Sequence, residues 1–88
     1  MTHGKTVDDV IRAVLGDVLA IDSERTAKFG DETPLFGALP ELDSMAVASL
    51  LTEIEDRLGF IIDDDEVDAD MLETFGALVR FARRKIRG

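Results

Sequence analysis

Residues 43–59 read DSMAVASLLTEIEDRLG. Apolar residues recur in this stretch at three- and four-residue spacing, the pattern of an amphipathic α-helix with one face on a core. Gly59 follows the last apolar residue, at the position where glycine commonly ends a helix. The stretch therefore predicts a helix over residues 44–58 whose inward stripe is Val47, Leu50, Leu51, Ile54 and Leu58.

Two further principal helices are predicted on either side of this one. The first runs from near Thr6, which can cap it, to near Ala20 and turns inward Val7, Val10, Ile11, Val14, Leu15 and Val18. The last begins after Thr74, a second candidate cap, and turns inward Phe75, Leu78, Val79, Ala82 and Ile86. A short turn of helix is expected around Asp68–Glu73, which completes an all-α four-helix bundle.

Residues 21–43 show no sustained period and contain the turn residues Gly30, Pro34, Gly37 and Pro40. A long connection in a small domain is unusual, and such loops are often functional. We expect its apolar residues to attach it to the core: Leu35, Phe36, Leu39 and Leu42.

The amino-acid composition indicates a small folded domain and argues against a disordered or membrane protein. The 88 residues predict one domain over residues 1–88, with residues 1–5 frayed. At 45% hydrophobic and 33% charged residues the chain is too apolar for disorder and too charged for a membrane protein. It has no apolar run typical of a signal peptide or a membrane span, and no cysteine. A cytoplasmic monomer without membrane insertion is expected.

The charge is uneven along the chain. The net charge is −9, all 19 acids lie within residues 1–73, and five of the ten basic residues lie in the last nine positions. Phosphate backbones would repel the acidic body, so nucleic-acid binding is not expected. The charge suits basic protein partners, although it also serves solubility alone.

No catalytic or metal constellation is found in the sequence. The one histidine, His3, lies near the end of the chain, and no base accompanies Ser44, which is a weak nucleophile without one. The acidic run DDDEVDAD, residues 63–70, lacks the glycine that a calcium loop needs at its sixth position. We therefore interpret this run as a solvated linker whose later acids cap the short helix, and we expect neither an enzyme nor a metal site.

Ser44 stands at the start of the predicted helix over residues 44–58. Either Asp43 or Ser44 can be the N-cap, which is the common role of such residues. A helix start also offers free N–H groups and a positive dipole, which suit an attached phosphate. The residues leave both roles open.

The sequence resembles the acyl carrier protein family. The resemblance rests on LDSM (42–45), LLTEIEDRLGFIID (50–63) and DEVDADMLETFGALVRF (65–81), together with the long first loop. It implies that a phosphopantetheinyl transferase attaches 4′-phosphopantetheine from coenzyme A to Ser44, and that the thiol of this arm holds acyl groups as thioesters. Such a carrier imports its reactive sulfur, which is consistent with a chain that has neither cysteine nor a general base.

The resemblance also implies docking residues. Asp43 would help orient the transferase complex, and Met45 would contact partners. The outward face of the helix would bind basic patches on loading ligases or synthases and on acyltransferases, through Ala48, Thr52, Glu55 and Asp56.

The sequence departs from the fatty-acid-synthesis pattern at two places. Pro40-Glu41-Leu42 replaces a glycine commonly found shortly before the Asp-Ser pair, and Ala46 and Ser49 occupy positions that are often acidic. A stand-alone carrier is therefore expected, one that serves a fatty-acid, polyketide or other specialised pathway. A peptidyl carrier and a helical adaptor with Ser44 as a mere cap are the alternatives.

Overall fold

The regular secondary structure of the described residues consists of four α-helices and two 3-10 turns. The computed structural model describes residues 6–87, in which the elements are α1 (Val7–Leu19), α2 (Ser23–Thr26), α3 (Ser44–Leu58), η1 (Asp64–Glu66), η2 (Asp70–Leu72) and α4 (Phe75–Arg87). Apart from one isolated bridge between Pro34 and Thr74, this range contains no strand pairing. The all-α class and the three principal helices are confirmed.

The predicted caps explain where the principal helices begin and end. The Thr6 hydroxyl accepts a hydrogen bond from the Asp9 N–H at 3.2 Å, and the Thr74 hydroxyl accepts one from the Ala77 N–H at 3.1 Å. Gly59 ends α3 with a φ of 76°, the left-handed conformation that glycine adopts without steric cost. Local sequence chemistry therefore sets the bounds of these helices.

The connections contain more regular structure than the sequence indicates. α2 is a single turn inside the stretch expected to be irregular, and Asp22 caps it. The short helix expected around Asp68–Glu73 is the 3-10 turn η2, with η1 as an additional turn before it. Single turns escape periodicity analysis because they are shorter than the pattern that would reveal them.

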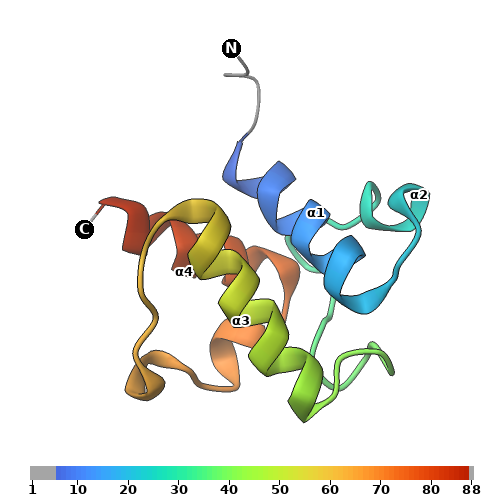
Figure 1. Ribbon diagram of the computed structural model, residues 1–88. Helices are drawn as coiled ribbons and strands as arrows, with labels where there is room; N and C mark the ends of the chain where they lie inside the picture. The colour runs from blue at the N-terminus through green and yellow to red at the C-terminus, as the bar shows by residue number, and fades with distance from the viewer. Residues whose placement is uncertain (1–5, 88) are drawn as a thin grey trace.

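α1 is the central element of the helical packing. It contacts α2, α3 and α4, as Figure 1 shows, and α4 also packs on η2. The fully buried side chains come from the three principal helices and from the long loop, where Leu35, Leu39 and Leu42 are buried as predicted. Phe36 was expected to join them, but 46% of its surface is exposed.

The inward face of α4 differs from the prediction at its end. Phe75, Leu78, Val79 and Ala82 are buried, but Ile86 is 48% exposed and Phe81 is buried instead. Ile86 lies in the last turn, where most neighbouring side chains are also exposed, so the helix extends past the core there. Within residues 6–87 no helix is both long and apolar enough to cross a bilayer.

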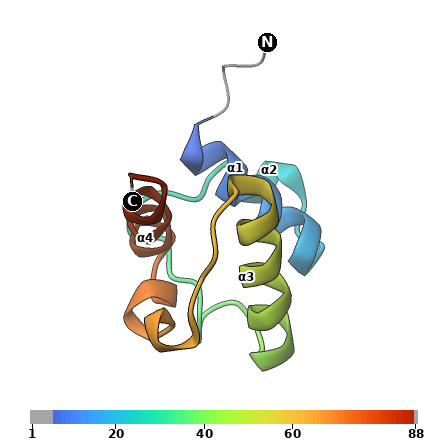
Figure 2. The same cartoon turned by 60° about the vertical axis from the view of Figure 1, so that its left-hand side comes forward.

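The chain after α3 runs back alongside that helix toward its start. Figure 2 shows this segment between α3 and the side of the molecule that carries α4. Ile61 in this segment is 71% exposed, and its neighbours Phe60 and Ile62 are half-buried. The segment therefore lies over the helices as a surface layer.

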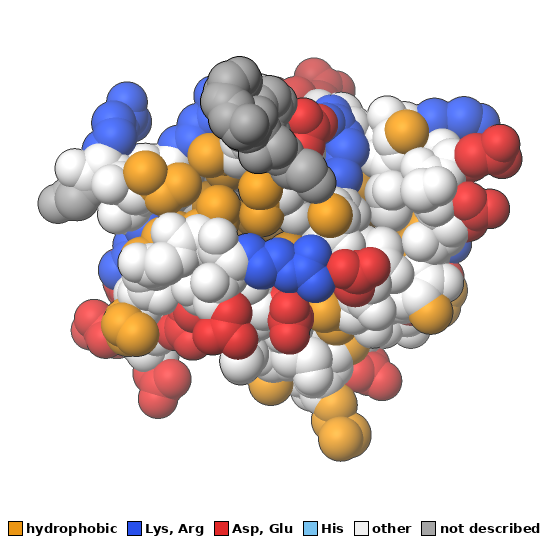
Figure 3. Space-filling model, turned by 45° about the horizontal axis from the view of Figure 1, so that its top comes forward, with side chains coloured by type: hydrophobic (Ala, Val, Ile, Leu, Met, Phe, Trp, Pro, Cys, Tyr) orange, Lys and Arg blue, Asp and Glu red, His pale blue; other side chains and the backbone are white. Residues whose placement is uncertain are grey.

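Basic residues of α4 pair with acids on three other segments. Arg80 contacts Asp31 at 3.0 Å, Lys85 contacts Glu66 at 2.9 Å, and Arg83 pairs with Asp8. Acidic and basic side chains accordingly lie next to one another on the face drawn in Figure 3. Each exposed pair contributes little to stability by itself, but together they connect α1, the long loop and η1 to α4.

A close approach of backbone fixes the long loop against the start of α4. The Phe75 N–H donates to Thr33 O at 2.8 Å, and the Gly76 N–H donates to Asp31 O at 3.0 Å. A Cβ on Gly76 would lie 2.5 Å from the Asp31 carbonyl oxygen, inside van der Waals contact. Glycine is therefore required at position 76 by space, and the loop that precedes Ser44 depends on it.

Gly76→Ala is expected to lower the free energy of unfolding by roughly 1–3 kcal/mol, because the added methyl overpacks the junction. Gly30→Ala is the matched control, since no atom lies within 4 Å of its added Cβ. Urea titration of both variants and the wild type measures the difference. Equal stabilities of the two variants would contradict the close approach.

Candidate functional site

Asp43, and not Ser44, caps α3. Its Oδ1 accepts a hydrogen bond from the Ala46 N–H at 2.8 Å, and its carbonyl oxygen accepts one from the Val47 N–H at 2.9 Å. Ser44 is the first helical residue and is exposed. The choice that the sequence left open is therefore settled, and the Ser44 hydroxyl is not used in capping.

The surroundings of Ser44 suit modification by another enzyme and not catalysis. Within residues 6–87 no side chain forms a hydrogen bond with its hydroxyl, so no general base activates it. The backbone N–H groups of Ser44 and Met45 also have no partner in that range. Free N–H groups and the positive end of a 15-residue helix fit an attached phosphate.

A groove of about 520 Å³ runs beside Ser44 between α3 and the returning segment. Val47 and Leu51 of α3 form one apolar wall, and Ile62 and Val67 form the opposite one. Glu55 and Asp64 supply polar groups along it. An apolar groove that begins at an exposed hydroxyl can shelter an apolar group attached there.

Most of the predicted docking residues share one face of α3. Met45 is 82% exposed, and Ala48, Thr52 and Asp56 are also exposed at helical spacing from it. Glu55 differs from them because it is half-buried and its Oε2 accepts a hydrogen bond from the Ile62 N–H at 2.6 Å. Glu55 therefore has a structural partner within the chain.

An ion pair that the sequence does not indicate holds the loop just before Ser44. Arg25 donates to Glu41 Oε2 at 2.9 Å, 16 residues along the chain. A hydrogen bond from its own backbone N–H, with the Arg25 guanidinium, holds the pKa of the Glu41 carboxyl below its ordinary value. Neither residue belongs to a periodic pattern, so only the structure reveals the pair.

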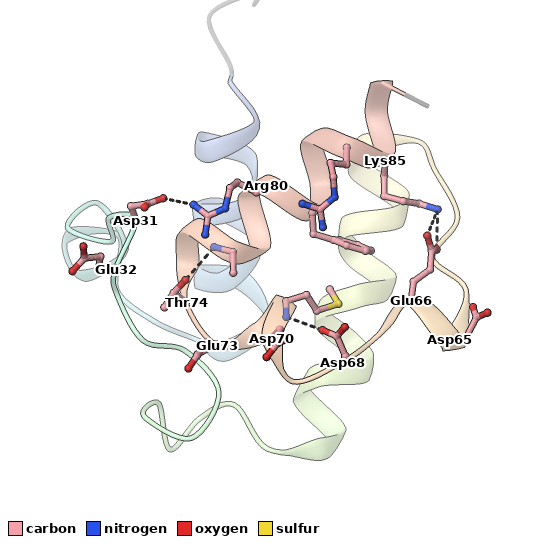
Figure 4. Close-up of a pocket in the computed structure, with 14 residues that line it drawn as sticks. Asp31, Glu32, Asp65, Glu66, Asp68, Asp70, Glu73, Thr74, Arg80 and Lys85 are labelled. Carbon is pink, nitrogen blue, oxygen red and sulfur yellow. Dashed lines mark hydrogen bonds and ion pairs between the residues drawn. The ribbon is translucent and has the colours of Figure 1, made fainter.

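A second, wider hollow lies on the α4 side and does not include Ser44. Figure 4 shows it spanned by ion pairs of Arg80 with Asp31 and of Lys85 with Glu66, while Asp68 accepts a hydrogen bond from the Met71 N–H of η2. Residues 6–87 contain no group of three or more acidic or histidine side chains placed to hold a metal ion. His3, and the predicted fraying of residues 1–5, fall outside the described residues.

Comparisons with known proteins agree with this geometry. Residues 9–82 match the family described as "Phosphopantetheine attachment site". The structure also matches the solution NMR structure of a holo acyl carrier protein from Nitrosomonas europaea, with a TM-score of 0.84 and 39% identity over 100% of both chains. None of the curated proteins compared with the chain matches it.

Asp43→Ala is expected to lower the free energy of unfolding by about 1 kcal/mol, because the Ala46 N–H loses its acceptor. Asp43→Ser should retain most of the stability, since serine is also a good N-cap. Thermal or urea unfolding of both variants checks the result. An Ala variant as stable as the Ser variant would show that the cap contributes nothing.

Proposed function

The chain belongs to the phosphopantetheine-attachment family, and we propose that Ser44 is the residue to which the phosphopantetheine is attached. We further propose that the chain carries acyl groups between the enzymes of a specialised pathway. Family and fold together identify a non-catalytic protein of the acyl carrier type with a covalently attached phosphopantetheine. That cofactor supplies a thiol that holds an acyl group as a thioester.

The observation that carries the proposal is the free hydroxyl at the head of α3. Asp43 takes the capping role, so Ser44 Oγ is exposed and has no partner within residues 6–87. A transferase can then join Ser44 Oγ to the phosphorus next to the pantetheine while the phosphate–phosphate bond of coenzyme A breaks, and the nucleotide part of coenzyme A leaves with the other phosphate. The hydroxyl proton leaves to a base of the transferase, because this chain supplies none.

The helix start then stabilises the attached group. The free N–H groups of Ser44 and Met45 can donate to phosphate oxygens, and the dipole of α3 favours the negative charge. The groove between Val47, Leu51, Ile62 and Val67 lets an apolar acyl group fold back onto the carrier. These residues bind and shelter the cargo without reacting with it.

Partner enzymes are proposed to dock on the face of α3 that carries Met45, Ala48, Thr52 and Asp56. The phosphopantetheinyl transferase, a loading ligase or synthase, and acyltransferases must all reach Ser44, and this face adjoins it. The exposed cap Asp43 is the acid nearest Ser44, and the first half of α3 itself contains none, since Ala46 and Ser49 stand among neutral residues there. Apolar contact through Met45 therefore complements the attraction of the acidic body for basic patches.

Incubation with coenzyme A and a broad-specificity phosphopantetheinyl transferase is expected to raise the intact mass by one phosphopantetheine group. Ser44→Ala should show no gain, because the acceptor oxygen is removed, and Ser49→Ala is the control that should still be modified. Intact-mass spectrometry reads the outcome. A wild-type protein without a mass gain would favour the helical adaptor, and a gain in Ser44→Ala would place the arm elsewhere.

Raising salt from about 0.05 M to about 0.5 M should slow this modification by roughly tenfold, because salt screens the attraction between the acidic carrier and a basic transferase. Met45→Ala should lower the modification rate, and the ratio of its rate to that of the wild type should be the same at every salt concentration, because salt does not screen an apolar contact. Asp56→Asn should slow the modification at low salt, because it removes an acid from the docking face. Glu32→Gln, at an exposed acid of the long loop, is its matched control. A rate independent of salt would show that docking is mainly apolar.

A further inference from the structure

The outer wall of the groove beside Ser44 is a segment that packs on the core with half-buried side chains only. We call residues 59–67 the strap; they run from the end of α3 through η1 to Val67. Phe60, Ile62 and Val67 pack against the core, but none of them is fully buried. The backbone hydrogen bonds of η1 are local, from Glu66 to Asp63 and from Val67 to Asp64. Polar contacts to α3 and α4 therefore add to this partial packing in holding the strap.

Two carboxylates supply these contacts. Glu55 of α3 accepts the Ile62 N–H at 2.6 Å, which attaches the strap to the helix that bears Ser44. Glu66 of the strap accepts Lys85 Nζ of α4 with both oxygens, at 2.9 and 3.1 Å, and its Oε1 also accepts the Asp63 N–H at 2.9 Å. All three side chains are half-buried, so these bonds are partly shielded from water.

The two attachments act from opposite sides of the strap. Glu55 lies in the groove with Ser44, and Lys85 lies in the hollow on the α4 side, where Figure 4 shows its pairing with Glu66. Ile62 and Val67, the apolar wall of the groove, stand at or next to the two attachment points. Moving the strap would widen the groove and would first break one of these attachments.

We propose that Glu55 and Lys85 are positioning residues whose hydrogen bonds hold the strap against α3 and thereby set how well an acyl group attached at Ser44 is sheltered in the groove. The part that concerns the acyl group rests on the proposed function; the attachment of the strap does not. Glu55 accordingly acts within the chain, although its place on α3 suggested a docking role.

Amide hydrogen exchange in the unmodified protein tests the attachment alone. Glu55→Ala should speed exchange at the Ile62 amide by about tenfold, while Glu55→Gln, which keeps an acceptor oxygen, should change it less. Glu53→Ala is the matched control on the same helix, because Glu53 pairs with Arg57 and not with the strap. Lys85→Ala should speed exchange at the Asp63 amide, with Arg84→Ala as its control.

An unchanged Ile62 exchange rate in Glu55→Ala would overturn the attachment, whether or not Ser44 is modified. Retained NMR dispersion shows that each variant is folded. If Glu55→Ala does not fold, Glu55→Asp carries the test, since its shorter side chain keeps the charge but not the reach to Ile62.

A second experiment tests the shelter. A transferase loads the carrier from octanoyl-coenzyme A, and hydroxylamine then cleaves the thioester to octanoyl hydroxamate and a free thiol on the carrier. Cleavage should be about threefold faster in Glu55→Ala than in wild type or Glu53→Ala. Equal cleavage rates together with faster Ile62 exchange would confine the role of Glu55 to the strap and overturn the shelter. Failure of loading in the wild type would instead count against the proposed function.

Discussion

The hydrogen bond from the Ala46 N–H to the Asp43 carboxylate defines the start of α3, and the candidate site follows from it. The Ala46 N–H lies in the first turn of the helix and has no acceptor within it. Because Asp43 accepts this hydrogen bond, the helix begins at Ser44, and the Ser44 hydroxyl is not needed as a cap. Within residues 6–87 the N–H groups of Ser44 and Met45 have no partner, so they are free to donate to a group attached to Ser44. A different cap would place the same serine in a different chemical role.

The long loop determines where this helix start lies in space. Leu35, Leu39 and Leu42 are buried, and the loop also hydrogen-bonds to the first residues of α4. The pair of Arg25 with Glu41 fixes the last turn of chain before Asp43. Thus a segment without regular structure over most of its length positions the site through buried leucines and backbone hydrogen bonds.

The sequence predicted those features that local chemistry determines. Apolar spacing and caps such as Thr6, Gly59 and Thr74 predicted the three principal helices. The position of Ser44 at the head of one of them left its role open, and only the resemblance to acyl carrier proteins implied the candidate site. Single turns such as α2 carry too few residues for a period. Ile86 was placed inward because periodicity records which face a residue occupies but not where the core ends. The bonds of Glu41 and Glu55 join residues with no shared pattern, so their partners follow only from the folded chain.

The strap has an evolutionary consequence. Its side chains are at most half-buried, and Ile61, Asp63, Asp64 and Asp65 are exposed. Substitutions at these exposed positions leave the buried core and the cap of α3 in place. Selection can therefore alter the outer side of the groove by changing a few surface residues while the fold persists. Proteins of this architecture can thus diverge in the shape of the groove at a small mutational distance.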